Sequence, residues 1–236
     1  MKNLIFAFAI LFFSMNFLAA QIGISGAYSN IGTPGWEEIL DTENVNRFNN
    51  GYTIGIDYWS RLKDYRIEFL PELSYSKFDN DFEGVPLNPF ASTGELSIIA
   101  LAFNTQIYLF DIEGDCDCPT WGKEGGFFNK GFYFMLGPGV SLVRHEDNVM
   151  VGLEENEIVE DSTVRLLLSA GAGFDIGITR AITLTLFGKI KWHSSSEWLG
   201  LNTVIESSPG QNNFDDTSSV ITQFEPGLKI HYRWEE

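Results

Sequence analysis

Apolar and polar residues alternate with a period of two along most of the chain, a pattern that predicts β-strands rather than helices. In the stretch 162–179, even positions such as Val164 and Leu166 are apolar, whereas most odd positions, such as Arg165 and Ser169, are small or polar. Seven further segments follow the same rule, with approximate bounds 21–31, 51–62, 65–78, 95–110, 131–142, 182–193 and 220–234.

The segment 95–110 is the least regular of the eight. Leu96 and Ile98 are apolar on one parity, whereas Ile99, Leu101 and the apolar residues that follow lie on the other. A β-bulge shifts the alternation by one residue. The pattern therefore predicts a bulge near Ile98.

The number and length of the segments indicate a barrel. A strand that crosses a membrane needs about 9–11 residues, and most segments reach that length. The connections after the second and sixth segments are short, around Lys63-Asp64 and Arg180, whereas those after the first, third, fifth and seventh are long and polar. Short periplasmic turns and long external loops are typical of outer-membrane barrels. We therefore predict an all-β fold, an eight-stranded antiparallel up-and-down transmembrane β-barrel.

The two faces of the segments support this prediction. Aromatic residues of the apolar parity gather at segment ends, as expected for side chains at the two membrane interfaces. The opposite parity carries charges of both signs, which can pair inside a narrow barrel: Asp57, Arg61, Arg66, Glu68, Glu72, Arg165, Asp175, Lys189, Lys191, Glu225, Lys229 and Arg233. The alternative is a soluble secreted sandwich or lipocalin-like binding protein, whose apolar face would turn into a core.

The first twenty residues have the layout of a cleaved secretory signal peptide. A positive start with Lys2 precedes an apolar stretch to Leu18, and Ala19-Ala20 form a small-residue cleavage site. We therefore expect residues 1–20 to be the signal peptide and residues 21–236 to form one barrel domain. The mature part has no run of eighteen apolar residues, so no spanning helix is expected.

Composition narrows the possible partners. The net charge of -17 makes nucleic acid an unsuitable partner, since phosphate binding needs a basic face. Much of the acidity lies in predicted external loops, at Glu37, Glu38, Asp41, Glu43, Glu154, Glu155, Glu157, Glu160 and Asp161. We expect contact with outer-membrane lipid and lipopolysaccharide. No calcium-loop spacing or phosphate-binding glycine loop occurs, so we expect no metal site and no cofactor.

The last segment ends in the aromatic run Lys229-Ile230-His231-Tyr232-Arg233-Trp234. With the signal peptide and the eight alternating segments, it resembles the outer-membrane β-barrel family common in Bacteroidetes, of the small porin-like, eight-stranded type. The resemblance covers nearly all of the mature chain and implies an outer-membrane location and a structural or porin-like role. It brings no catalytic motif. Glu235-Glu236 after Trp234 depart from the aromatic terminus that such barrels often have.

Cys116 and Cys118 lie in the long connection from Asp111 to Lys130. An oxidising compartment favours a disulfide between them, although free thiols, intermolecular pairing and a metal or redox role remain alternatives. By topology this connection is periplasmic, and we expect it to fold as a small knob for contact with a periplasmic or envelope partner.

The polar end of the seventh segment offers the only candidate for catalysis. His193, Ser195 and Glu197 resemble the His-x-Ser element of outer-membrane lipid A deacylases, which implies a base, a nucleophile and an orienting carboxylate respectively. A polar strand end entering a loop explains the same residues without catalysis. We therefore expect a non-enzymatic barrel with an interior largely filled by side chains, and keep a lipid A-modifying hydrolase as the alternative.

Overall fold

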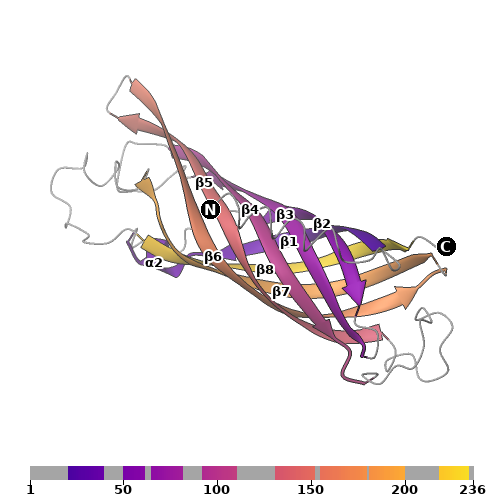
Figure 1. Cartoon of the computed structure of the whole chain (residues 1–236). Helices are drawn as coiled ribbons and strands as arrows, with labels where there is room; N and C mark the ends of the chain where they lie inside the picture. Colours follow the sequence, from indigo (N-terminus) through magenta and orange to yellow (C-terminus); the bar gives the residue numbers. More distant parts are fainter. Residues whose placement is uncertain are drawn as a thin grey trace, which may run out of the picture.

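The computed structural model describes residues 21–39, 50–61, 65–81, 92–110, 131–151, 155–179, 181–199 and 218–233. These residues form eight strands and one short helix (Figure 1). The elements are β1 (Gln21–Gly32), α2 (Pro34–Ile39), β2 (Gly51–Arg61), β3 (Ile67–Asp81), β4 (Ser92–Ile107), β5 (Phe132–Val151), β6 (Glu155–Gly177), β7 (Ile182–Glu197) and β8 (Ser218–Arg233).

The strands form a closed barrel in which each strand pairs antiparallel with its sequence neighbours and β8 pairs with β1. Following paired residues once around the barrel from Gln21, through Leu70 and Lys191, leads back to β1 at Ile31, ten residues further on. This stagger tilts the strands against the barrel axis. The predicted eight-stranded antiparallel barrel is confirmed.

Strands β5 and β6 are the longest and project beyond the rest of the barrel (Figure 1). They stay paired as far as Val151 and Glu155. The prediction of a long acidic loop after the fifth segment was therefore wrong, because Glu155, Glu157, Glu160 and Asp161 belong to β6. The physical reason is that backbone pairing with β5 continues through this polar stretch. Glu154 lies outside the described residues.

The bulge predicted near Ile98 was also wrong. The pairing of β4 with β3 and β5 is unbroken there, with Ile98 opposite Ser76 on one side and Val143 on the other. Leu96 and Ile98 are 0% and 1% exposed. The change of parity has a different physical cause: these two side chains point inward and join an apolar cluster inside the barrel.

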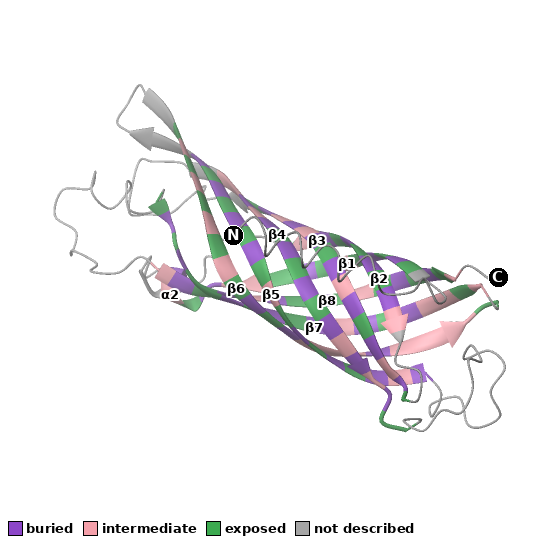
Figure 2. Cartoon of the chain, in the orientation of Figure 1, coloured by how far each residue is buried: buried purple, intermediate pink, exposed green. Residues whose placement is uncertain are grey.

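Exposure alternates between inward and outward residues along most of the barrel wall (Figure 2), whereas the stretch 170–177 of β6 is of intermediate exposure apart from Gly173. Among the described residues no helix is both long and apolar enough to cross a membrane. The helix α2 has six residues and lies at the same end of the barrel as the β5–β6 extension (Figure 1).

Candidate functional site

The outer surface of the barrel carries a belt of large apolar side chains. Val164 and Leu166 are 70% and 71% exposed, whereas the next residue of β6, Leu167, is on the opposite face and is 4% exposed. All the remaining strands contribute exposed members to the belt: Ile22, Ile24, Tyr28, Tyr52, Ile54, Ile56, Tyr58, Phe69, Leu73, Ile99, Leu101, Phe103, Phe134, Leu136, Val140, Leu142, Leu186, Ile190, Trp192, Phe224, Leu228, Ile230 and Tyr232. Single exposed apolar residues are normal on a water-soluble surface, but a contiguous belt marks a surface that contacts something apolar.

The middle of the interior holds a chain of alternating charges. Lys189 Nζ lies 2.6 Å from Glu72 Oε1 and 3.4 Å from Glu225 Oε2, and Glu225 Oε1 lies 2.9 Å from Lys191 Nζ. In the other direction Glu72 Oε2 lies 3.8 Å from Lys229 Nζ. The complete order of contacts is Lys191, Glu225, Lys189, Glu72, Lys229, Asp57 and His231. We call these residues the interior charge chain.

The interior charge chain has equal numbers of lysines and carboxylates, and each of these groups lies in an ion pair. His231 Nε2 donates to Asp57 Oδ1 at 2.9 Å. Neutral side chains complete the network, with Asn104 donating to Glu72 and Lys191 donating to the Ser74 hydroxyl. Removing charges from water is costly unless they are paired and hydrogen-bonded. Because positive and negative side chains alternate along the interior charge chain, each charge that the apolar belt surrounds has an oppositely charged neighbour.

The contacts of the chain run across the barrel as well as along its wall. Lys189 and Lys191 come from β7, whereas their partners Glu72 and Ser74 come from β3. Neither of these strands pairs with the other, and three strands separate them on each side of the barrel. The bond between Lys189 and Glu72 therefore bridges opposite walls.

A second group of interior contacts lies toward the end of the barrel where β1 begins and β8 ends. The Tyr108 hydroxyl lies 3.0 Å from Glu68 Oε2 and 2.5 Å from Asp175 Oδ2, and its single proton is shared between these two acceptors. The Arg66 guanidinium lies 3.9 Å from the centre of the Tyr108 ring. Tyr108 packs with the buried Tyr133, Met135 and Phe187. This end of the interior is thus occupied by aromatic rings with charged partners.

The opposite end of the interior is apolar. Trp36 on α2 and Trp198 after β7 lie with their ring centres 5.3 Å apart, and both are buried. We call this group the apolar cap, and its members are Trp36, Phe78, Leu96, Ile98, Val143, Trp198 and Ile221. The chain can bring α2 this close to β8 because of Gly35, whose added Cβ would lie 2.6 Å from the carbonyl oxygen of Ser218.

His145 and Asp147 border the apolar cap beyond the apolar belt, since their outward neighbours on β5 are the charged Arg144 and Glu146. Burial raises the pKa of the Asp147 carboxyl to about 6, and a hydrogen bond from Trp198 Nε1 opposes the rise. Burial lowers the pKa of His145 to about 4, because its charged form would lose water contact. Both residues are therefore disposed to be neutral near pH 5.

The structure separates the three residues of the alternative catalytic site. His193 is buried in the interior, where its Nε2 donates to Gln223 Oε1 at 3.0 Å and its Nδ1 lies 2.8 Å from the Ser141 hydroxyl. Ser195 and Glu197 are exposed. A spacing of two would put His193 and Ser195 on one side of a regular strand, but the pairing of β7 with β8 shifts between His193 and Ser196. Neither nitrogen of His193 contacts Ser195.

The remaining predicted site residues are outside the described part of the chain. They comprise Cys116, Cys118 and the connection from Asp111 to Lys130, together with residues 1–20. Within the described ranges no group of three or more His, Cys, Asp or Glu side chains is placed to hold a metal ion.

The apolar cap is the main feature that sequence reasoning missed. Its one signal in the sequence was the apolar parity of Leu96 and Ile98, which equally fits a bulge. Trp36 and Trp198 gave no periodic signal, because they lie outside the alternating segments.

No protein-family model matches the chain, and no curated protein sequence matches it. Solved structures with a similar course of the chain include a major outer membrane protein from Thermus thermophilus, with 9% identity, coverage of 92% of this chain and 100% of that chain, and a TM-score of 0.49. Ail, the attachment invasion locus protein of Yersinia pestis, has 11% identity, coverage of 92% and 98%, and a TM-score of 0.46. Neisserial surface protein A has 11% identity, coverage of 91% and 97%, and a TM-score of 0.43. With these values, function has to be argued from the residues of this chain.

Proposed function

We propose that this protein is an outer-membrane β-barrel of structural, porin-like type whose interior is closed to solutes by its own side chains. The observation that carries the proposal is the inverted distribution of side chains. Large apolar residues are exposed around the outside, whereas Glu72, Lys189, Glu225 and Lys229 are buried and paired inside.

The outer belt supports a lipid environment. Apolar surface contributes roughly 25 cal/mol per Å² when it is removed from water, so a belt of exposed leucine, isoleucine and valine is unfavourable in an aqueous compartment. In a lipocalin-like soluble barrel these residues would point inward. Strands alternating between a lipid-facing and an interior-facing side are the general arrangement of membrane barrels.

The interior supports a closed barrel. The charge chain bridges β3 and β7 in the middle, and aromatic groups lie toward both ends. An ion crossing the barrel would have to separate Lys189 from Glu72 and displace both Trp36 and Tyr108. Because each of these side chains is buried among several partners, we expect no steady conductance.

The predicted signal peptide and the even strand number favour an orientation with both ends of the mature chain in the periplasm. In that orientation the β5–β6 extension and α2 face outward from the cell, where acidic residues of the extension meet solvent and lipopolysaccharide. The connection from Asp111 to Lys130 then faces the periplasm and is available to an envelope partner. The resemblance to Bacteroidetes-type barrels and the Cys116–Cys118 disulfide stay predictions.

Two measurements on the full-length protein test the proposal. Membrane fractionation with heat-modifiable migration on a gel reports insertion and a stable barrel together. Recovery of folded protein from the soluble fraction without detergent would contradict the membrane location. Planar-bilayer recording of the purified barrel tests closure separately, and a large steady pore would contradict it while leaving the location intact.

A further inference from the structure

At the edge of the apolar belt, outward side chains of β3, β4, β5 and β6 form three rows that follow the strand pairing. The first row is largely apolar and consists of Tyr75 and the belt residues Ile99, Leu142 and Val164. The next row contains two cations and two hydroxyl groups, in the order Lys77, Ser97, Arg144 and Ser162. The outermost row is acidic throughout, in the order Asp79, Glu95, Glu146 and Glu160.

The two cations serve all four acids. Lys77 Nζ lies 2.6 Å from Glu95 Oε2 and 4.0 Å from Asp79 Oδ1. Arg144 Nη2 lies 3.1 Å from Glu160 Oε2 and 3.5 Å from Glu146 Oε2. Like charges directly opposite each other on paired strands are unfavourable. Two cations facing four carboxylates leave the rows with an excess negative charge that a further positive group would offset.

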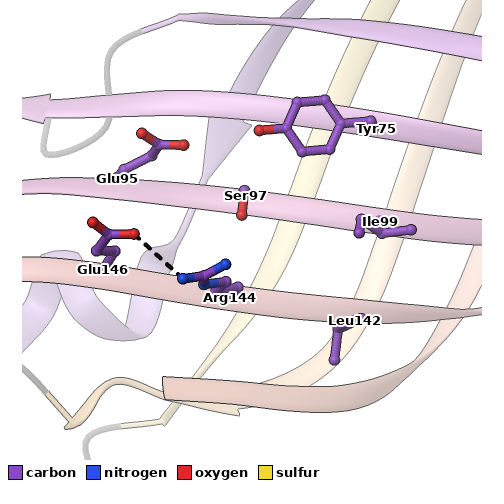
Figure 3. Close-up of a pocket in the computed structure, with 7 residues that line it drawn as sticks. All are labelled: Tyr75, Glu95, Ser97, Ile99, Leu142, Arg144 and Glu146. Atoms are coloured by element: carbon purple, nitrogen blue, oxygen red, sulfur yellow. Dashed lines mark ion pairs between the residues drawn. The ribbon is translucent and has the colours of Figure 1, made fainter. Parts of the chain in front are cut away.

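A pocket on this surface combines the three rows. Its volume is about 230 Å³, and its lining consists of Tyr75, Glu95, Ser97, Ile99, Leu142, Arg144 and Glu146. Figure 3 shows Ile99 and Leu142 at one end, Glu95 and Glu146 at the other, and Arg144 with Ser97 between them. The side chains of Arg144 and Glu146 are about half exposed, so a ligand in the membrane interface can reach them.

We propose that this pocket binds the phosphoethanolamine headgroup of a lipid. The order of groups along such a lipid is acyl chain, phosphate and ammonium, and the order of rows is apolar, cationic and acidic. Acyl carbons would contact Ile99 and Leu142, the phosphate would lie beside Arg144, and the ammonium would lie between Glu95 and Glu146. The inference rests on the proposed membrane location, which sets the apolar row at the edge of the hydrocarbon layer on the external side, so the ligand is a lipid of that leaflet that carries phosphoethanolamine, and phosphatidylethanolamine serves as the probe.

The acidic row favours an organic ammonium over a metal ion. Within the described ranges its carboxylates are not grouped closely enough to hold a metal. An ammonium has three donors on a flexible stem and can hydrogen-bond to separate carboxylates. A purely anionic headgroup would meet the acidic row without a compensating charge.

Native mass spectrometry of the purified barrel in detergent, with phosphatidylethanolamine and phosphatidylglycerol in competition, tests the proposal. We expect phosphatidylethanolamine to be retained about threefold more, the effect of a few exposed charge contacts. The decisive variant carries Lys77→Glu, Glu95→Lys, Arg144→Glu and Glu146→Arg. This reversed-row variant keeps the composition, makes the middle row acidic and places cations at the two central positions of the outer row, between Asp79 and Glu160, so we expect the preference to disappear. Arg144→Lys, which keeps the charge, should retain it.

Four results would overturn the inference. One is equal retention of the two lipids by the natural protein, and another is an unchanged preference in a reversed-row variant that still migrates as a folded barrel. The third is phosphatidylglycerol retention that depends on Mg²⁺ and is lost with a chelator. Displacement of the lipid by free phosphoethanolamine at equal concentration would show that the acyl contacts contribute nothing, which also contradicts it. Since heat-modifiable migration is recorded for every variant, loss of lipid preference in a folded, membrane-bound barrel leaves the proposed function standing.

Discussion

Two lysine–glutamate pairs in this barrel have the same separation and opposite surroundings. Lys189 and Glu72 in the interior, and Lys77 and Glu95 on the outer surface, both have a nitrogen–oxygen distance of 2.6 Å. The interior pair is 3% and 2% exposed, whereas the outer pair is 29% and 37% exposed. The two pairs thus have equal nitrogen–oxygen distances, and burial decides how much unfolding free energy is lost when one partner is removed. Inside, the partner left behind is a charge without water; outside, water replaces the missing partner.

The largest effect is expected from Glu72→Gln. This change leaves the interior charge chain with one uncompensated positive charge, and breaking a buried pair costs about 3–5 kcal/mol of unfolding free energy. Urea unfolding of the barrel in detergent measures it. The double variant Glu72→Gln with Lys189→Gln restores neutrality and should recover part of the loss. A loss below that of an exposed pair would contradict the assigned burial.

Two adjacent isoleucines extend the same comparison to apolar side chains. Ile98→Ala leaves a cavity in the apolar cap and should cost about 2–5 kcal/mol. Ile99→Ala removes an outward side chain, where lipid or detergent closes the gap, so we expect a cost of less than about 1 kcal/mol. Unfolding of the two variants under identical conditions measures the difference, and equal costs would favour a bulge that turns both residues to similar surroundings.

The pH dependence of stability provides a smaller effect with a defined sign. The pKa of Asp147 is raised from 3.8 to about 6, so its contribution to stability is lost as pH rises from about 4 to about 6. The pKa of His145 is lowered from 6.5 to about 4, so its contribution is gained over nearly the same range. The two opposing trends largely cancel in the natural protein. His145→Gln should leave stability that falls as pH rises, and Asp147→Asn should leave stability that increases.

Unfolding midpoints measured between pH 4 and pH 6.5 check these trends. If both variants follow the natural protein, burial of His145 and Asp147 does not control their protonation.

The smallest effect is expected from Glu95→Gln on the outer surface. An exposed ion pair contributes about 0.2–1 kcal/mol, and Lys77 keeps Asp79 as a more distant partner. Unfolding in low and high salt measures the change, which should shrink further as salt screens the pair. A cost near that of Glu72→Gln would mean that the outer rows are shielded from water.

Alternation predicted the strand count, the closed fold and the side of the wall on which Asp57, Glu72 and Lys189 lie. It could not predict which charges meet. Lys189 and Glu72 lie on strands that are not neighbours, and their contact across the barrel depends on how far the strands are staggered. The parity change at Ile98 was visible in the sequence, but its cause depended on side chains from other strands and from α2. The separation of His193 from Ser195 depended on a register shift that spacing does not reveal.

The most direct test of the inverted barrel uses two adjacent leucines, Leu166 and Leu167, which are 71% and 4% exposed. Each is replaced by cysteine in a chain whose Cys116 and Cys118 are changed to serine, and a spin label is attached for accessibility measurements in lipid bilayers. We predict that the label at Leu166 is accessible to oxygen, which dissolves in lipid, and not to a water-soluble nickel complex, whereas the label at Leu167 is accessible to neither. Access of the nickel complex to the label at Leu166 would contradict a lipid-facing belt.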